Sequence, residues 1–163
     1  MIGGVRPSFP AQAMAATLRP GVLGVSHGAA ARLHRLAGFE EYQVIDVIGR
    51  RGSHLRVPPP ITAHYSRGPL DQHLVRVGTI AVTSIPLTLA LIVRGIGRAE
   101  AFAALDDVLG RGVPADSIRL VARQWREPGR SGPGLLLRLL DRMPTRSTRS
   151  AEGRGAQLSR VRR

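Results

Sequence analysis

Apolar residues recur along the chain in short blocks separated by glycine and proline, and the clearest blocks have helical spacing. In the segment 116–126, four apolar side chains occupy positions i, i+3, i+4 and i+7, namely Ile118, Val121, Ala122 and Trp125. The segment 28–37 lies between Ser26 and Gly38, which are typical helix-capping residues. The pattern predicts helices over residues 11–18, 28–37, 99–111, 116–126 and 133–143.

Other blocks are rich in β-branched residues and predict strands over residues 42–48, 61–65, 73–77 and 80–82. The pair Gly78-Thr79 predicts a hairpin between the last two strands, and the run 49–52 predicts a turn that starts another hairpin or a meander. Three consecutive prolines, residues 58–60, cannot lie inside a sheet, so the chain is expected to be extended there. We therefore expect an α+β fold, with a small antiparallel sheet flanked by helices and followed by a three-helix region.

The longest uncharged run, residues 77–93, lies between Arg76 and Arg94 and reaches the lower length limit for a membrane-spanning helix. It has Pro86 near its middle and four hydroxyl-bearing side chains. We interpret the run as a buried strand, a turn with Ser84 as the helix N-cap, and a helix that opens near Pro86. Length and polarity favour this interpretation over a membrane span.

The composition changes after the last predicted helix. The chain has 163 residues, with 24 basic residues that are all arginine, 11 acidic residues, no cysteine and a formal net charge of +13. Residues 1–137 hold 16 arginines and 9 acidic residues, net +7, whereas residues 138–163 hold 8 and 2, net +6. The segment 144–163 has too few apolar residues to build a core. We expect a folded domain over residues 1–143 and a disordered, arginine-rich tail over residues 144–163.

Candidate catalytic chemistry is sparse. Neither a G-x-S-x-G elbow nor a Walker A or G-x-G-x-x-G loop occurs in the sequence. His27 and His34 are seven residues apart and would share a helix face, but the sequence places no third metal ligand beside them. Asp106 and Asp107 are adjacent on a predicted helix, so they face different directions and do not form a carboxylate pair. We expect a non-enzymatic protein with no cofactor and no metal.

Arginines form the clearest candidate binding surface. Three of them recur at i, i+4 and i+7 on the helix 116–126, opposite its apolar face, and two more lie four residues apart on the next helix. Guanidinium groups bind phosphate oxygens bidentately, and such contacts release counterions from nucleic acid. The predicted nucleic-acid-binding residues are Arg119, Arg123, Arg126, Arg130, Arg138 and Arg142. The alternative interpretation is a solvated face in an arginine-rich protein.

Three segments carry a family resemblance: residues 25–36 (VSHGAAARLHRL), residues 80–84 (IAVTS) and residues 104–112 (ALDDVLGRG). They resemble, in the same order, the VSHxSAAxLxGL helix, the I-P-V-T-S helix entry and the A-L-D-x-A-L-R-R-G helix of AbiEi-like antitoxins from type IV toxin-antitoxin systems. The resemblance covers roughly residues 10–143. The chain departs from the family after Ser84, because Leu87 and Leu91 stand where relatives carry charged residues.

The resemblance implies a cytoplasmic bacterial antitoxin-like protein whose relatives repress their own operon and oppose a nucleotidyltransferase-like toxin. Such relatives read DNA through an N-terminal winged helix, and many carry a C-terminal nuclease-like domain of the very-short-patch-repair class. This chain shows neither feature, so it resembles the middle module alone, as in a truncated copy. We expect a transcriptional regulator module that binds DNA weakly and largely without sequence preference, with the toxin as a partner and no membrane.

Two other hypotheses stay open. The first is a protein-interaction module that remains from a nuclease-fused relative and has no DNA role of its own. The second is a peripheral membrane protein that uses its arginines and the run 77–93. Salt-dependent DNA binding separates the first hypothesis from a regulator, and liposome flotation tests the second.

Overall fold

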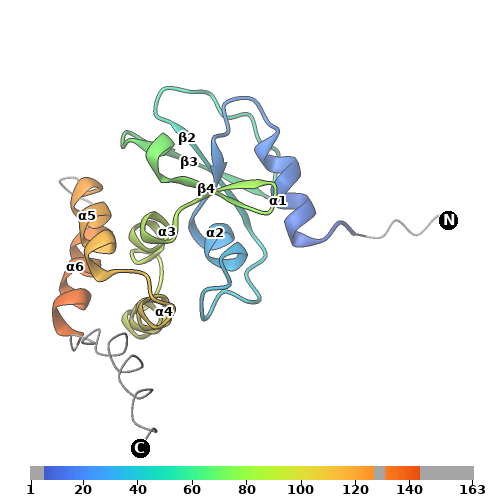
Figure 1. Cartoon of the computed structure of the whole chain (residues 1–163). Coiled ribbons are helices and arrows are strands. Elements are labelled where there is room, and N and C mark those ends of the chain that lie inside the picture. Colours follow the sequence, from blue (N-terminus) through green and yellow to red (C-terminus); the bar gives the residue numbers. More distant parts are fainter. Residues whose placement is uncertain (1–5, 127–130, 144–163) are drawn as a thin grey trace, which may run out of the picture.

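The computed structural model describes residues 6–126 and 131–143, in which helices pack around a five-stranded sheet of order β3-β2-β1-β5-β4 (Figure 1). The strands are β1 (Gly24–Val25), β2 (Ile45–Arg50), β3 (Ile61–Ser66), β4 (Leu74–Val77) and β5 (Ile80–Thr83). The helices are α1 (Phe9–Thr17), α2 (His27–Leu33), the short 3-10 helix η1 (Leu70–His73), α3 (Ile85–Ile92), α4 (Arg98–Gly110), α5 (Ala115–Gln124) and α6 (Ser131–Arg142). The α+β class and the three-helix region predicted from the sequence are thus confirmed.

The sheet is mixed rather than wholly antiparallel. Strands β1 and β2 pair antiparallel, as do β4 and β5, whereas β1–β5 and β2–β3 are parallel pairs. The expected hairpin or meander at residues 49–52 was therefore wrong, because β2 and β3 run in the same direction, in a register from Ile45 opposite Ile61 to Arg50 opposite Ser66. Parallel neighbours need a crossover, and residues 51–60 supply it. The hairpin predicted between β4 and β5 is present, and Gly78 adopts φ +59° in its turn.

The two faces of the sheet carry different helices. Val25, Val47 and Val82 form one buried cluster with Phe9 and Ala13 of α1. Side chains alternate between the faces of a strand, so Ile48, next to Val47, lies on the opposite face. There Ile48 belongs to a second buried cluster, with Leu70, Leu87 of α3, and Val121 and Trp125 at α5.

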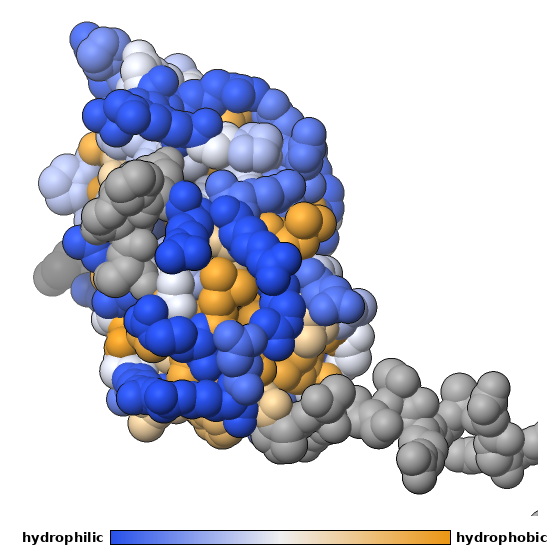
Figure 2. Space-filling model, turned by 90° about the vertical axis from the view of Figure 1, so that its left-hand side faces the viewer, coloured by the Kyte–Doolittle hydropathy of each residue, from blue (hydrophilic) through white to orange (hydrophobic). Residues whose placement is uncertain are grey.

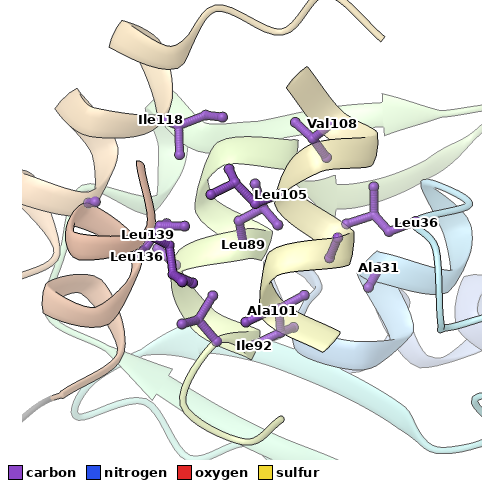
Figure 3. Packing of buried hydrophobic residues seen from close by; sticks show 14 of the residues in the cluster. Ala31, Leu36, Leu89, Ile92, Ala101, Leu105, Val108, Ile118, Leu136 and Leu139 are labelled. Carbon is purple, nitrogen blue, oxygen red and sulfur yellow. The ribbon is translucent and has the colours of Figure 1, made fainter. Parts of the chain in front are cut away.

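The largest core lies between helices rather than on the sheet. Buried side chains of α2, α3, α4, α5 and α6 point toward one another in it (Figure 3). Among them Leu89, Leu105, Ile118 and Leu136 have no exposed surface. The run 77–93 comprises the end of β4, all of β5 and α3, as the sequence predicted. Its helix α3 enters this core, whereas Ile80 and Val82 of β5 belong to the cluster between the sheet and α1. No helix of residues 6–126 and 131–143 is both long enough and apolar enough to cross a membrane.

Helix α2 ends four residues earlier than predicted. It stops at Leu33 instead of residue 37, and Arg35 adopts the left-handed region with φ +56°. A contact with another helix accounts for this end, because the guanidinium of Arg111 at the end of α4 binds the backbone carbonyls of His34 and Arg35. Asp107 of α4 accepts a hydrogen bond from the backbone N–H of Ala37 at 3.2 Å.

Helical spacing predicts that Phe102, Leu105 and Leu109 lie on the packed side of α4. Leu105 is buried and Leu109 packs against the core, whereas Phe102 is 44% exposed. The buried residues of α4 are Ala101, Ala104, Leu105 and Val108. Small alanine side chains let the neighbouring helices approach closely. The expectation that Phe102 lies on the packed side was therefore wrong. The proposed disordered tail over residues 144–163 lies outside the described residues.

Candidate functional site

Helices α5 and α6 carry the predicted cationic surface. Arg123 on α5, Arg126 just beyond it, and Arg138 and Arg142 on α6 are all exposed. No acidic side chain within residues 6–126 and 131–143 forms an ion pair with any of these four. We call this set of four arginines the α5–α6 cationic face. The helical stripe predicted on α5 is shorter than expected, because the helix ends at Gln124 and Arg126 lies outside it.

Arg119 differs from the other predicted arginines. Its Nη1 lies 2.5 Å from Oδ1 of Asp141, so this guanidinium forms an ion pair that links α5 to α6. Its charge is neutralised locally, which makes it a poorer phosphate ligand than Arg123 one turn away. Arg130 lies outside the described residues. Four of the six predicted residues are therefore exposed on α6, on α5 or directly after α5, and none of the four has an acidic partner in the part of the chain that the structure describes.

Hydrophobic surface interrupts this cationic region. Figure 2 shows the side of the molecule on which α5 and α6 lie, where hydrophilic side chains surround patches of hydrophobic ones. Leu120 of α5 is 59% exposed and precedes Arg123 by three positions, so the two share a helix face. The surface thus offers charge and a small apolar contact together.

A second candidate site, which sequence reasoning missed, centres on a buried carboxylate. Asp46 of β2 is only 3% exposed and accepts three hydrogen bonds. The Nε2–H of His64 in β3 donates to Oδ1 at 2.8 Å, and the hydroxyl of Tyr42 donates to Oδ2 at 2.7 Å. The backbone N–H of Ala29 in α2 donates to the same Oδ2 at 3.3 Å. We call Asp46, His64, Tyr42 and His27, which stacks on His64, the Asp46 cluster.

The surroundings of Asp46 determine its charge. Burial alone would raise the pKa of this carboxyl group, because it disfavours the ionised form. The hydrogen bonds from His64 and Tyr42 and the positive charge of nearby histidines outweigh burial, so the pKa of Asp46 lies below its usual value. Burial and the neighbouring carboxylate raise the pKa of Tyr42, which keeps its hydroxyl protonated as the donor. The carboxylate is therefore ionised at neutral pH, and both of its oxygens accept hydrogen bonds.

His27 and His64 stack on each other. Their ring centroids are 3.6 Å apart with an interplanar angle of 19°. His27 adopts the left-handed region with φ +48°, where a residue with a side chain is strained. Its Nδ1 lies 2.9 Å from Oγ of Ser26. Strain of this kind persists only where the surrounding contacts hold it, and here they place one imidazole against another.

Gly28 is required for the position of Tyr42. A Cβ atom on Gly28 would lie 2.3 Å from Cζ of the Tyr42 ring, which is far inside contact distance. The ring of Tyr42 therefore packs directly on the backbone of α2, and any side chain at residue 28 would displace it. This contact explains why glycine opens a helix in which it otherwise lowers stability.

His27 and His34, which helical spacing would place on one face, have different partners, and His34 lies just beyond the end of α2. His27 and His34 do not meet, because Nε2 of His34 donates to the carbonyl of Thr83 at 2.7 Å while His27 stacks on His64. Among residues 6–126 and 131–143, no group of three or more histidine, aspartate or glutamate side chains is arranged to hold a metal ion. Asp46 and His64 are 18 residues apart, and only the parallel pairing of β2 with β3 brings them together.

Two cavities adjoin the stacked histidines. His64 lines an open basin of about 580 Å³ with Arg51, Ser53, His54 and Tyr65. His27 lines a smaller cavity, of about 90 Å³, together with Arg94 and Trp125. Asp46 itself is 3% exposed and lines neither cavity.

Burial of His34 predicts a pH dependence of stability. Burial is the main reason that the pKa of His34 lies below its usual value; the hydrogen bond to Thr83 opposes this and the charge of Arg111 adds to it. A lowered pKa means that the folded state favours the neutral ring. The contribution of the neutral His34 ring to the free energy of unfolding is therefore complete above about pH 6.5 and is lost as the pH falls below that value. We expect the melting temperature to fall less between about pH 7.5 and pH 5 in His34→Gln, which keeps an N–H donor, than in the wild type. Identical pH profiles for the two proteins would contradict this assignment.

Comparison of the chain with family models, with curated proteins and with solved structures found no match. The resemblance noted in the sequence therefore rests on its three motifs alone.

Proposed function

We propose that the chain is a non-enzymatic, antitoxin-like transcriptional regulator module that binds DNA through the α5–α6 cationic face. The observation that carries this proposal is the set of four exposed arginines on α6, on α5 and just after α5, none of which has an acidic partner within residues 6–126 and 131–143. Unpaired guanidinium groups on a rigid helical pair gain more from phosphate than a paired group such as Arg119 does. The net charge of +13 supports the same partner.

The kind of binding follows from the residues that provide it. Arginine side chains that contact phosphates position a protein on DNA without reading its sequence. Binding should therefore be weak and largely non-specific, on the order of 10⁻⁴ to 10⁻⁶ M at physiological salt. A cytoplasmic location and a nucleotidyltransferase-like toxin as a protein partner belong to the same proposal, and they rest on the motif resemblance.

One observation favours a second candidate function, a protein-interaction module without a DNA role. Leu120 is 59% exposed within the region of the cationic face. Protein interfaces commonly combine exposed apolar side chains with arginine, which is enriched there. A toxin docked on this surface would use both Leu120 and the arginines, whereas DNA would use the arginines alone.

The test is a charge-neutralising pair on the two helices. We expect Arg123→Gln with Arg138→Gln to weaken binding to a duplex DNA fragment and to reduce the slope of log K against log salt by about 1.8, because two phosphate contacts are lost. Fluorescence anisotropy over a salt series measures both quantities. Thermal stability should change little, since both side chains are exposed and have no ion pair with a described residue.

The matched control is Arg19→Gln with Arg76→Gln, which removes the same charge from exposed positions after α1 and on β4. It should leave the salt slope close to that of the wild type. Equal losses in the two double variants would show that net charge alone drives binding and would contradict the assigned face. Unchanged DNA binding in Arg123→Gln with Arg138→Gln would contradict the assigned face. No DNA binding by the wild type at low salt would favour the protein-interaction module.

A further inference from the structure

The ion pair between α5 and α6 lies at the surface of the molecule. The side chain of Arg119 is 30% exposed and that of Asp141 is 65% exposed, so a ligand in solution can reach the pair. Ile118 of α5 and Leu136 and Leu139 of α6 are buried in the same core cluster and hold the two helices together. An exposed ion pair adds little to the stability that such packing provides. The fold therefore does not depend on this pair.

Asp141 occupies an unfavourable place in its own helix. It lies in the last turn of α6, which ends at Arg142, and the C-terminal end of a helix carries a partial negative charge. A carboxylate there opposes the helix macrodipole, whereas an arginine side chain is favourable. Asp141 is also the only acidic residue of α6, and it lies between Arg138 and Arg142 in the sequence. The macrodipole thus gives no reason for an aspartate at this position.

The ion pair also sets which arginines lie near Asp141. Only residues 125–130 separate the two helices, and connections of this length join antiparallel neighbours (Figure 1). Arg119 lies opposite Asp141, so one turn further along α5 is Arg123 and one turn back along α6 is Arg138. These two exposed arginines therefore lie toward the same end of the helix pair, about 5 Å along the helix axes from the ion pair.

A carboxylate at this place weakens phosphate binding in two ways. It neutralises the guanidinium of Arg119, which would otherwise be available one turn from Arg123. It also places a negative charge close to any phosphate bound at Arg138. Charges within about 8 Å of each other are only partly screened at physiological salt, so this repulsion persists there.

We propose that Asp141 is an internal competitor for phosphate, which limits the affinity of the α5–α6 cationic face for DNA. The inference rests on the proposed function, because it concerns the same face. The Asp141 carboxylate and a DNA phosphate both accept charge-assisted hydrogen bonds from a guanidinium group, so the two compete for Arg119. Arg119 is thus a further phosphate ligand that the carboxylate withholds from DNA.

The experiment compares Asp141→Asn with the wild type, as full chains, by fluorescence anisotropy on a labelled duplex DNA fragment over a salt series. We expect Asp141→Asn to bind roughly three- to tenfold more tightly at about 0.1 M salt. The slope of log K against log salt should become steeper by about 0.9, because Arg119 gains one phosphate contact. Asp141→Glu keeps the charge and should restore the weaker binding. The melting temperature of Asp141→Asn should stay within about 2 °C of the wild-type value, since the pair is exposed.

Two further variants separate the release of Arg119 from a change in net charge. Asp106→Asn removes the same charge from an exposed position on α4, and it should leave the affinity and the slope close to those of the wild type. Arg119→Gln combined with Asp141→Asn removes the guanidinium that the single variant releases. The slope of this double variant should therefore return to the wild-type value.

The outcomes distinguish this inference from the proposed function. Equal affinity and slope in Asp141→Asn and the wild type would overturn the inference, as would equal gains in Asp141→Asn and Asp106→Asn. A steeper slope that persists when Arg119→Gln is added would also overturn it, because Arg119 would not be the group released. In each of these cases the wild type still binds DNA, so the proposed function stands. If neither the wild type nor Asp141→Asn binds duplex DNA at low salt, both proposals fail.

Discussion

Replacing Leu89 by arginine is expected to unfold the protein. Leu89 lies in α3 with no exposed surface and belongs to the core cluster with Leu105, Ile118 and Leu136 (Figure 3). A guanidinium group placed there has no acidic partner among the residues of that cluster. Burial of an unpaired charge costs several kcal/mol, which is a large part of the roughly 5 to 15 kcal/mol that stabilises a typical domain.

The control for this change is the same substitution at an exposed leucine. Leu120→Arg on α5 replaces a side chain that is 59% exposed, so we expect its effect to stay within about 0.5 kcal/mol. Circular dichroism melting and the soluble fraction after expression compare the two variants. A cooperative melting transition of Leu89→Arg close to that of the wild type would show that α3 is not a core helix.

Local sequence signals identified most of the elements. The hairpin between β4 and β5 follows from Gly78, which adopts a positive φ that other residues resist. The start of α3 follows from Pro86 in its first turn, while Ser84 occupies the N-cap position without a side-chain capping hydrogen bond. The buried face of α5 follows from the spacing of Ile118 and Val121. Each of these features depends on residues close together in the chain, so a linear pattern contains the information.

Such local signals did not predict how the strands pair. The run 49–52 has the composition of a hairpin turn, yet the chain crosses over and β3 joins β2 in parallel. The choice between the two pairings depends on which hydrophobic surfaces remain to be covered, and this is a property of the whole fold. The end of α2 is a similar case, because Arg111 and Asp107 of α4 bind the backbone that follows Leu33.

The same distinction holds for the two candidate sites. Helical periodicity predicted Arg123 and Arg138 on neighbouring surfaces, but it did not predict that Asp141 would pair with Arg119. The Asp46 cluster was missed altogether, since its residues come from α2, β2, β3 and the loop between α2 and β2. The only sequence signal was a single aspartate inside an apolar strand, where a buried charge needs partners.

Asp46→Ala is expected to be the most destabilising change in the Asp46 cluster. It removes the acceptor of three hydrogen bonds and leaves the hydroxyl of Tyr42 and the backbone N–H of Ala29 without a partner. Each buried donor that loses its acceptor costs about 1 to 3 kcal/mol, and His64 recovers part of its loss from water because its side chain is 29% exposed. We expect a total loss of about 2 to 4 kcal/mol, or a melting temperature lowered by roughly 5 to 15 °C.

Two comparisons make this prediction specific to the carboxylate. Asp106→Ala removes an exposed aspartate from α4 and should change stability by less than about 0.5 kcal/mol. Tyr42→Phe should destabilise the wild type more than it destabilises Asp46→Ala, because the hydroxyl has already lost its acceptor there.

The stabilising effect of Asp46 should also depend on pH. The pKa of Asp46 is lowered in the folded state, so the contribution of its ionised carboxylate to the free energy of unfolding is complete above about pH 4. This contribution is lost as the pH falls through the pKa of the folded state. The difference in melting temperature between the wild type and Asp46→Ala should therefore decrease toward about pH 2. A difference that stays constant with pH would show that the substitution removes packing rather than charge interactions.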